Sequence, residues 1–178
     1  MKNFLFLAIL SLCLFSCKDR ESDPNVLPEA TQSGKNTAGA LVDGRVWVAT
    51  ESYLNSTGGA GTFCEKINNT TIIQIDLRHI SDKSRIFFKA EIEDFELNRT
   101  YDLYENIDTS DYNYAYYSDN SGNGYMTQPN SEYIGKLKIT KLNLLSDQMV
   151  CGTFELKAID HNGKVLTITD GRFDKKFD

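Results

Sequence analysis

Polar and apolar residues alternate with a period of two along much of this chain. The alternation runs through residues 71–80, 85–93, 136–140 and 150–158. In 85–93, apolar residues take the even-numbered positions, while four of the odd-numbered positions carry a charge. A strand turns successive side chains to opposite faces, so this pattern gives one apolar face and one wet face. Such strands are typical of an antiparallel sheet rather than of buried parallel strands.

Turn signals separate the alternating segments. Residues 160–163 contain Asn162-Gly163, a strong signal for a tight hairpin, and residues 42–45 read in the same way around Asp43-Gly44. No segment shows a convincing helical stripe. We therefore predict an all-β fold, an antiparallel β-sandwich or a flattened β-barrel of about eight strands.

The N-terminus has the layout of a bacterial lipoprotein signal. Lys2 precedes an apolar run over residues 4–15, and Ser16 stands immediately before Cys17. The run is too short to cross a bilayer of roughly 30 Å, and it lacks the polar positions of an amphipathic core helix. We expect a signal peptide over 1–16, lipid on Cys17, and a location on the outer membrane, at the cell surface.

Residues 17–36 are expected to form the lipid anchor and a flexible tether, because they are rich in Pro, Ser and charge. One β domain then covers residues 37–178. Residues 1–16 contain one lysine and no acid, so a chain starting at Cys17 has 18 basic and 25 acidic side chains, a net charge of about −7. Nucleic acid is not an expected partner, because its binding depends on neutralised phosphates.

Two cysteines, Cys64 and Cys151, lie in the expected domain. An even pair in an exported protein can form a disulfide, whereas the alternative is two isolated free thiols. The sequence leaves both possibilities open, because it does not show whether the two residues lie within bonding distance.

Several blocks of the chain resemble a family of uncharacterised lipoproteins of the Bacteroidota. The blocks are residues 40–47, 135–140, 152–156 and 168–174. The resemblance covers roughly residues 37–178 and implies an all-β, lipid-anchored domain, but the family has no established activity. It also implies a small residue such as Ser at the position of Cys151, so a bridge from Cys151 would be a local feature of this chain.

The segment after Cys17 also bears on location. Residues 17–23 resemble the acidic export signals that follow the lipidated cysteine in surface lipoproteins of the Bacteroidota. The alternative is an ordinary hydrophilic tether, and the sequence favours neither.

Tyrosines cluster late in the chain, where eight of the nine fall between residues 101 and 133. In a strand, Tyr112, Tyr114 and Tyr116 would share one face. The candidate ligand-binding residues are Tyr112, Asn113, Tyr114, Tyr116, Tyr117 and Asp119. Aromatic faces beside amides and carboxylates suit a glycan, and tyrosine-rich loops also suit protein contacts. A solvated edge strand rich in Tyr is the structural alternative.

Other chemistry finds little support. Residues 119–124 match the front of a calcium loop, but its twelfth position holds Asn130 rather than Glu, so a plain turn is favoured and no metal is expected. Neither histidine, His79 or His161, lies in a triad or zinc motif. We therefore expect no enzyme activity, no catalytic residues and no cofactor.

The function expected from these features is non-catalytic binding of a glycan or small ligand by a lipid-anchored envelope protein. The expected partners are the membrane, through the anchor, and a glycan or an envelope protein. The alternatives are a protein-interaction or structural component of an envelope assembly, and an inhibitor or immunity-like protein.

Overall fold

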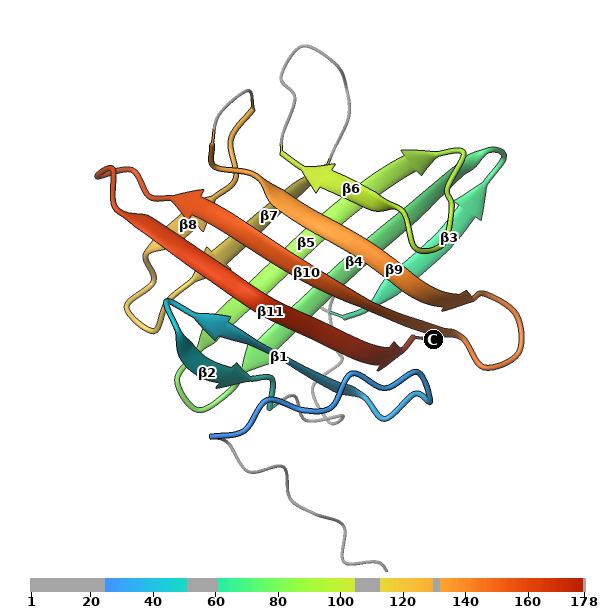
Figure 1. Cartoon of the computed structure of the whole chain (residues 1–178), viewed down its shortest axis with the longest axis horizontal. Helices are drawn as coiled ribbons and strands as arrows, with labels where there is room; N and C mark the ends of the chain where they lie inside the picture. The colour runs from blue at the N-terminus through green and yellow to red at the C-terminus, as the bar shows by residue number, and fades with distance from the viewer. Residues whose placement is uncertain (1–24, 51–60, 105–112, 130–131, 178) are drawn as a thin grey trace, which may run out of the picture.

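The protein is described from a computed structural model, which covers residues 25–50, 61–104, 113–129 and 132–177 (Figure 1). Within these residues the chain forms eleven strands and no helix. The strands are β1 (Thr37–Val42), β2 (Arg45–Val48), β3 (Phe63–Ile67), β4 (Thr70–His79), β5 (Ser84–Glu93), β6 (Thr100–Leu103), β7 (Tyr114–Ser118), β8 (Gly124–Met126), β9 (Gly135–Asn143), β10 (Met149–Ile159) and β11 (Val165–Lys176).

All strands belong to one sheet, and every pair of neighbours is antiparallel. One limb contains β2, β1, β11, β10, β9 and β6, and the other contains β8, β7, β5, β4 and β3. β10 joins the limbs, because it pairs with β9 along most of its length and with β8 at Ile159. The sheet is therefore a strongly curled half-barrel, with β9, β10 and β11 crossing in front of β4 and β5 in Figure 1.

The predicted all-β antiparallel class is confirmed. Eleven strands are found among the described residues, against about eight expected. Three of the strands, β2, β6 and β8, have only three or four residues. Segments this short hold too few residues to show a period of two, so the alternation could not reveal them.

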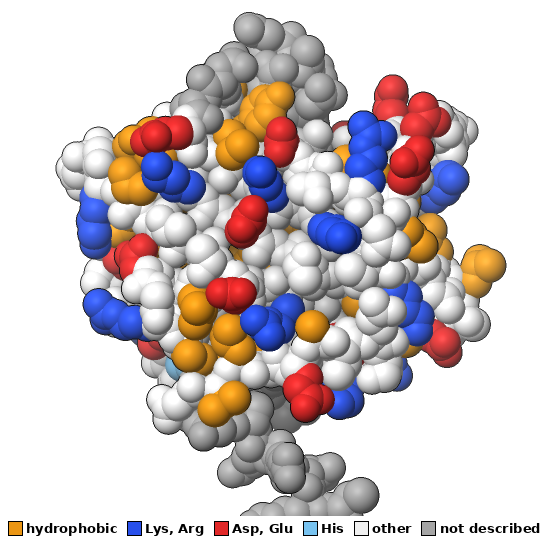
Figure 2. All heavy atoms as spheres, viewed as in Figure 1, with side chains coloured by type: hydrophobic (Ala, Val, Ile, Leu, Met, Phe, Trp, Pro, Cys, Tyr) orange, Lys and Arg blue, Asp and Glu red, His pale blue; other side chains and the backbone are white. Residues whose placement is uncertain are grey.

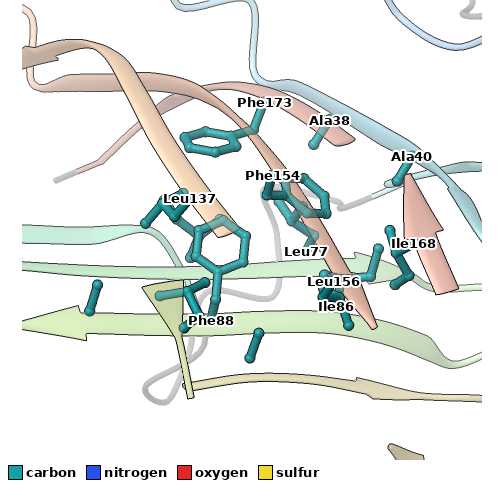
Figure 3. Packing of buried hydrophobic residues seen from close by; sticks show 14 of the residues in the cluster. Ala38, Ala40, Leu77, Ile86, Phe88, Leu137, Phe154, Leu156, Ile168 and Phe173 are labelled. Carbon is teal, nitrogen blue, oxygen red and sulfur yellow. The ribbon is translucent and has the colours of Figure 1, made fainter. Parts of the chain in front are cut away.

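Three phenylalanines connect the two limbs across the core (Figure 3). The Phe88 ring on β5 lies 5.2 Å from that of Phe154 on β10 and 5.6 Å from that of Phe173 on β11, measured between ring centroids. Gly152 and Gly171 make room for these rings, because a Cβ on Gly152 would lie 2.8 Å from Phe173 Cζ and one on Gly171 would lie 2.6 Å from Phe154 Cδ2. The two glycines thus allow the aromatic core to close.

Both predicted hairpins are present. β1 and β2 meet at Asp43-Gly44, where both residues have positive φ, 47° and 78°. β10 and β11 meet through residues 161–163, where only Gly163 has positive φ. Asp160 closes this second loop, because its Oδ1 accepts hydrogen bonds from the backbone N–H groups of Asn162 and Lys164 at 2.9 and 2.8 Å.

Residues 31–36 run along β11 and are hydrogen-bonded to it. Thr31 Oγ1 and the N–H groups of Ser33 and Gly34 donate to Asp174 at 2.5, 3.0 and 2.7 Å. The part of the expected tether nearest the domain therefore has fixed contacts with the sheet. The signal peptide, Cys17 and the start of the tether lie outside the described residues. Among the residues that are described, no helix is long and apolar enough to cross a membrane.

Candidate functional site: an aromatic patch on β5 and β7

Two of the predicted tyrosines stand side by side on the outer face of the sheet. Along β7, Tyr114 and Tyr116 are half-buried and point outward, while Ala115 and Tyr117 are buried and point into the core. The predicted common face is thus present for Tyr114 and Tyr116. Tyr112 lies outside the described residues.

Phe87 of β5 underlies both tyrosines. It pairs with Tyr116 in the register of the two strands, and its ring centroid lies 5.7 Å from Tyr114 and 6.4 Å from Tyr116. Although Phe87 points out of the sheet, only 8% of it is exposed. The tyrosines therefore cover an apolar ring, and the three rings form one continuous aromatic surface.

Arg85 borders this surface. Its guanidinium carbon lies 4.9 Å from the ring centroid of Phe87 and 5.6 Å from that of Tyr116. Cation–π contacts of this kind favour a guanidinium held over an aromatic face. We call Phe87, Tyr114, Tyr116 and Arg85 the aromatic patch.

Asp76 of β4 fixes the position of Arg85. Its carboxylate is buried and accepts hydrogen bonds from Arg85 Nε at 2.6 Å and Nη2 at 3.1 Å. The same carboxylate accepts from Arg78 Nε and Nη2 at 3.1 and 2.8 Å. Burial lowers the pKa of Arg85, but the hydrogen bonds and negative charge of Asp76 outweigh it, so the net shift is upward. Arg85 is therefore a fixed positive charge at the edge of the patch.

Two exposed apolar side chains lie on the same face as the patch, on other strands of the sheet. Met126 of β8 pairs with Tyr116 and is 41% exposed. Phe63 of β3, 42% exposed, lies in the register row that continues through Gln74 and Lys89 to Tyr114. Exposed apolar surface on a soluble domain often marks a place of interaction.

The other candidate residues have structural contacts instead. Tyr117 packs on Tyr125 in the core at 6.0 Å between ring centroids, and burial raises the pKa of its hydroxyl. Asn113 Oδ1 accepts a hydrogen bond from the Glu91 N–H at 2.6 Å. These side chains hold the sheet together and do not point toward a ligand on the patch.

Asp119 closes a turn. Its carboxylate accepts from the N–H groups of Ser121 and Asn123, both at 2.9 Å, and from Asn123 Nδ2 at 2.8 Å. The hydrogen bond from the Asn123 side chain is the main cause of a lowered Asp119 pKa. The segment that resembles the front of a calcium loop thus forms a turn. The described residues contain no group of three or more His, Cys, Asp or Glu side chains placed to hold a metal ion.

Sequence reasoning missed Phe87, Arg85 and Asp76. One signal was available, because Phe87 is an apolar residue at a position where the alternation of 85–93 calls for a polar one. Such a residue can be covered by side chains of a neighbouring strand, as Phe87 is by Tyr114 and Tyr116. Which strand that would be could not be read from the local pattern.

The structure shows free thiols at Cys64 and Cys151, so the possible disulfide between them is not formed. Cys64 lies on the edge strand β3, whereas Cys151 lies on β10 in the other limb. Cys151 Sγ instead donates a hydrogen bond to Asp174 Oδ1 at 3.2 Å. Burial raises the pKa of each thiol to about 12.

A cluster of hydrogen-bonded side chains lies at the hairpin between β4 and β5. Asp82 Oδ1 lies 3.0 Å from His79 Nδ1 and accepts a hydrogen bond from Ser84 Oγ at 2.5 Å. Ser84 Oγ also accepts from Trp47 Nε1 at 2.7 Å. In a serine triad the imidazole stands between the hydroxyl and the carboxylate, whereas here the carboxylate stands between the other two. This group ties the hairpin to β2.

Fold and site together define an all-β half-barrel domain that carries a preorganised aromatic patch on its outer face. No family model, curated protein or solved structure matches the chain.

Proposed function

We propose that this protein is a lipid-anchored envelope lipoprotein whose β domain binds a glycan or another small ligand, without catalysis, at the aromatic patch. The observation that carries the proposal is the pair Tyr114 and Tyr116, side by side on the outer face over Phe87. Each ring offers an apolar face, and each hydroxyl offers a donor and an acceptor.

The patch is suited to a sugar because its parts are already in place. The tyrosine rings rest on Phe87, and Arg85 is held by Asp76, so little side-chain freedom is lost when a ligand arrives. A pyranose has an apolar face for stacking and hydroxyls for Arg85 and the tyrosine hydroxyls.

The remainder of the proposal follows from the sequence. The signal peptide over 1–16 and lipid at Cys17 would hold the domain on the outer membrane, at the cell surface, and the segment before β1 would give it reach. The resemblance of residues 37–178 to uncharacterised lipoproteins of the Bacteroidota supports this placement.

The test is a glycan array probed with the full chain in detergent micelles, beside a Tyr114→Ala/Tyr116→Ala variant. We expect a sugar signal that the variant loses. The matched control is Tyr101→Ala/Tyr133→Ala, because these two tyrosines are also half-buried but lie outside the patch. Circular dichroism checks whether each variant is folded. A signal that survives in the patch variant contradicts the proposal.

The exposed side chains of Phe63 and Met126 favour a second candidate, a protein contact on the same face. In that case the array stays silent and one envelope protein copurifies with the full chain. Replacing Tyr114, Tyr116 and Met126 would then release that partner. An inhibitor or immunity-like role would be recognised by the identity of the partner.

A further inference from the structure

A groove lies on the limb opposite the aromatic patch, on the outer face of β6, β9, β10 and β11. Its volume is about 350 Å³, and its lining includes Thr100, Lys138, Thr153, Glu155, Asp170 and Arg172. Figure 2 views this limb and shows basic and acidic side chains close together on its surface. We infer that this groove is a second binding site, independent of the aromatic patch, and that its ligand is a carboxylate-bearing sugar.

One row of the sheet brings two cations and two hydroxyls together. In the strand registers, Thr100 pairs with Lys138, Lys138 with Thr153, and Thr153 with Arg172. Strands lie about 4.8 Å apart, so the Cα atoms of Lys138 and Arg172 are separated by roughly 10 Å across Thr153. Both side chains are long enough to meet on one anionic group above Thr153. The four paired positions hold no carboxylate.

The two cations of this row differ from other basic residues in the described part of the chain. Lys138 and Arg172 form no ion pair within the described part of the chain, whereas Arg78, Arg85, Lys89 and Lys157 all do. Arg172 Nε donates to the backbone carbonyl of Asp170 at 3.1 Å, which orients the guanidinium and leaves its terminal nitrogens for a ligand. In a chain of net charge −6, two cations that form no ion pair with any described residue favour an anion in this groove.

The neighbouring part of the groove carries two carboxylates, Glu155 and Asp170, beside Lys136. Glu155 is exposed and is the register partner of Lys136 on β9, and Asp170 is exposed at a register shift of β11 with a φ of 52°. These carboxylates can accept hydrogen bonds from hydroxyl groups, but they repel a second negative charge. A sugar acid can bind both parts of the groove. Its carboxylate would accept hydrogen bonds from Lys138 and Arg172, and its hydroxyls would donate hydrogen bonds to Glu155 and Asp170. The volume is also that of a small-ligand site.

The test is isothermal titration calorimetry on the full chain in detergent micelles at low ionic strength, with glucuronate, glucose and inorganic phosphate as probes. We expect glucuronate to bind, glucose to give no measurable heat, and phosphate to bind more weakly than glucuronate. Lys138→Gln and Arg172→Gln are each expected to lower the affinity for glucuronate about tenfold, because each removes a charge-assisted hydrogen bond. Thr153→Val, which removes one hydroxyl, should weaken binding as well.

Lys66→Gln is the matched control, because Lys66 is an exposed lysine on β3 in the other limb. The affinity of this variant for glucuronate should equal that of the unmodified chain. Equal losses of affinity for glucuronate in this control and in Lys138→Gln would overturn the inference. Phosphate binding at least as tightly as glucuronate would also overturn it, and so would the absence of glucuronate binding to the unmodified chain. The Tyr114→Ala/Tyr116→Ala variant should bind glucuronate unchanged. This arm separates failure of the groove from failure of the aromatic patch.

Discussion

The thiol of Cys151 donates a hydrogen bond to the carboxylate of Asp174, with 3.2 Å between Sγ and Oδ1. The two residues are register partners on β10 and β11. The same carboxylate receives the donors of residues 31–34, so it joins the N-terminal segment to the sheet. The buried carboxylate of Asp174 therefore contacts both the Cys151 thiol and the segment that leads to the predicted anchor.

We expect both domain thiols to be unreactive in the folded protein. Burial raises the pKa of Cys64 and of Cys151 to about 12, so thiolate is scarce at neutral pH. Iodoacetamide at pH 8, followed by peptide mass spectrometry, should leave both residues unmodified in the native chain and alkylate both in urea. Rapid alkylation of native Cys151, or a peptide pair joined by a disulfide, would contradict this prediction.

The free energy of unfolding should decrease as the pH is lowered, because Asp174 becomes protonated. Burial alone would raise the pKa of this carboxyl, but its hydrogen bonds outweigh burial and lower it from 3.8 to about 2. A lowered folded-state pKa stabilises the fold above pH 4, and this contribution is lost as the pH falls from about 4 to 2. The size expected is about 2 kcal/mol in the free energy of unfolding.

Urea unfolding of the full chain at several pH values between 2 and 6 measures this effect. An Asp174→Asn variant should be less stable than the unmodified chain at pH 6. Its free energy of unfolding should also decrease less between pH 4 and 2, because it has no carboxylate to protonate at this position. If the unmodified chain and the variant lose stability in parallel between pH 4 and 2, another group is responsible.

Adding a methyl group at Gly152 or Gly171 should destabilise the core. The new Cβ would overlap the Lys138 carbonyl oxygen at Gly152 and the Phe154 carbonyl oxygen at Gly171, and it would also crowd an aromatic ring. Overpacking of this kind costs about 1–3 kcal/mol. Thermal and urea unfolding of Gly152→Ala and Gly171→Ala check it, with Gly61→Ala as the control because its Cβ would meet no atom of a described residue within 4 Å. Unchanged stability in either core variant would show that the strands can separate at no cost.

Asp76→Asn should lower the stability of the fold and loosen the position of Arg85 in the aromatic patch. The buried carboxylate accepts four hydrogen bonds from Arg78 and Arg85, and loss of its charge is expected to cost about 2 kcal/mol in the free energy of unfolding. Asp147→Asn is the control, because Asp147 is exposed in the loop between β9 and β10, and its effect should stay within about 0.5 kcal/mol. Equal stabilities of the two variants would mean that Asp76 does not hold Arg85 in place.

Much of the fold could be predicted because side-chain direction in a strand is a local property. The apolar positions of the alternating segments do face the core, as Ile75, Phe88 and Leu156 show with exposures of 0%, 0% and 3%. Both predicted hairpins form where Gly permits positive φ. The common face of Tyr114 and Tyr116 follows from the same period of two.

The sequence by itself thus determined the strand class, the inward faces and the turns, since these depend on neighbours along the chain. Only the tertiary structure decided which strands adjoin. It set Phe87 under Tyr116, Asp76 beside Arg85, and Cys151 against Asp174 rather than Cys64. These contacts depend on the register between strands and on how the sheet curls. Register and curvature are set by the packing of the whole core around Phe88, Phe154 and Phe173, which no local pattern contains.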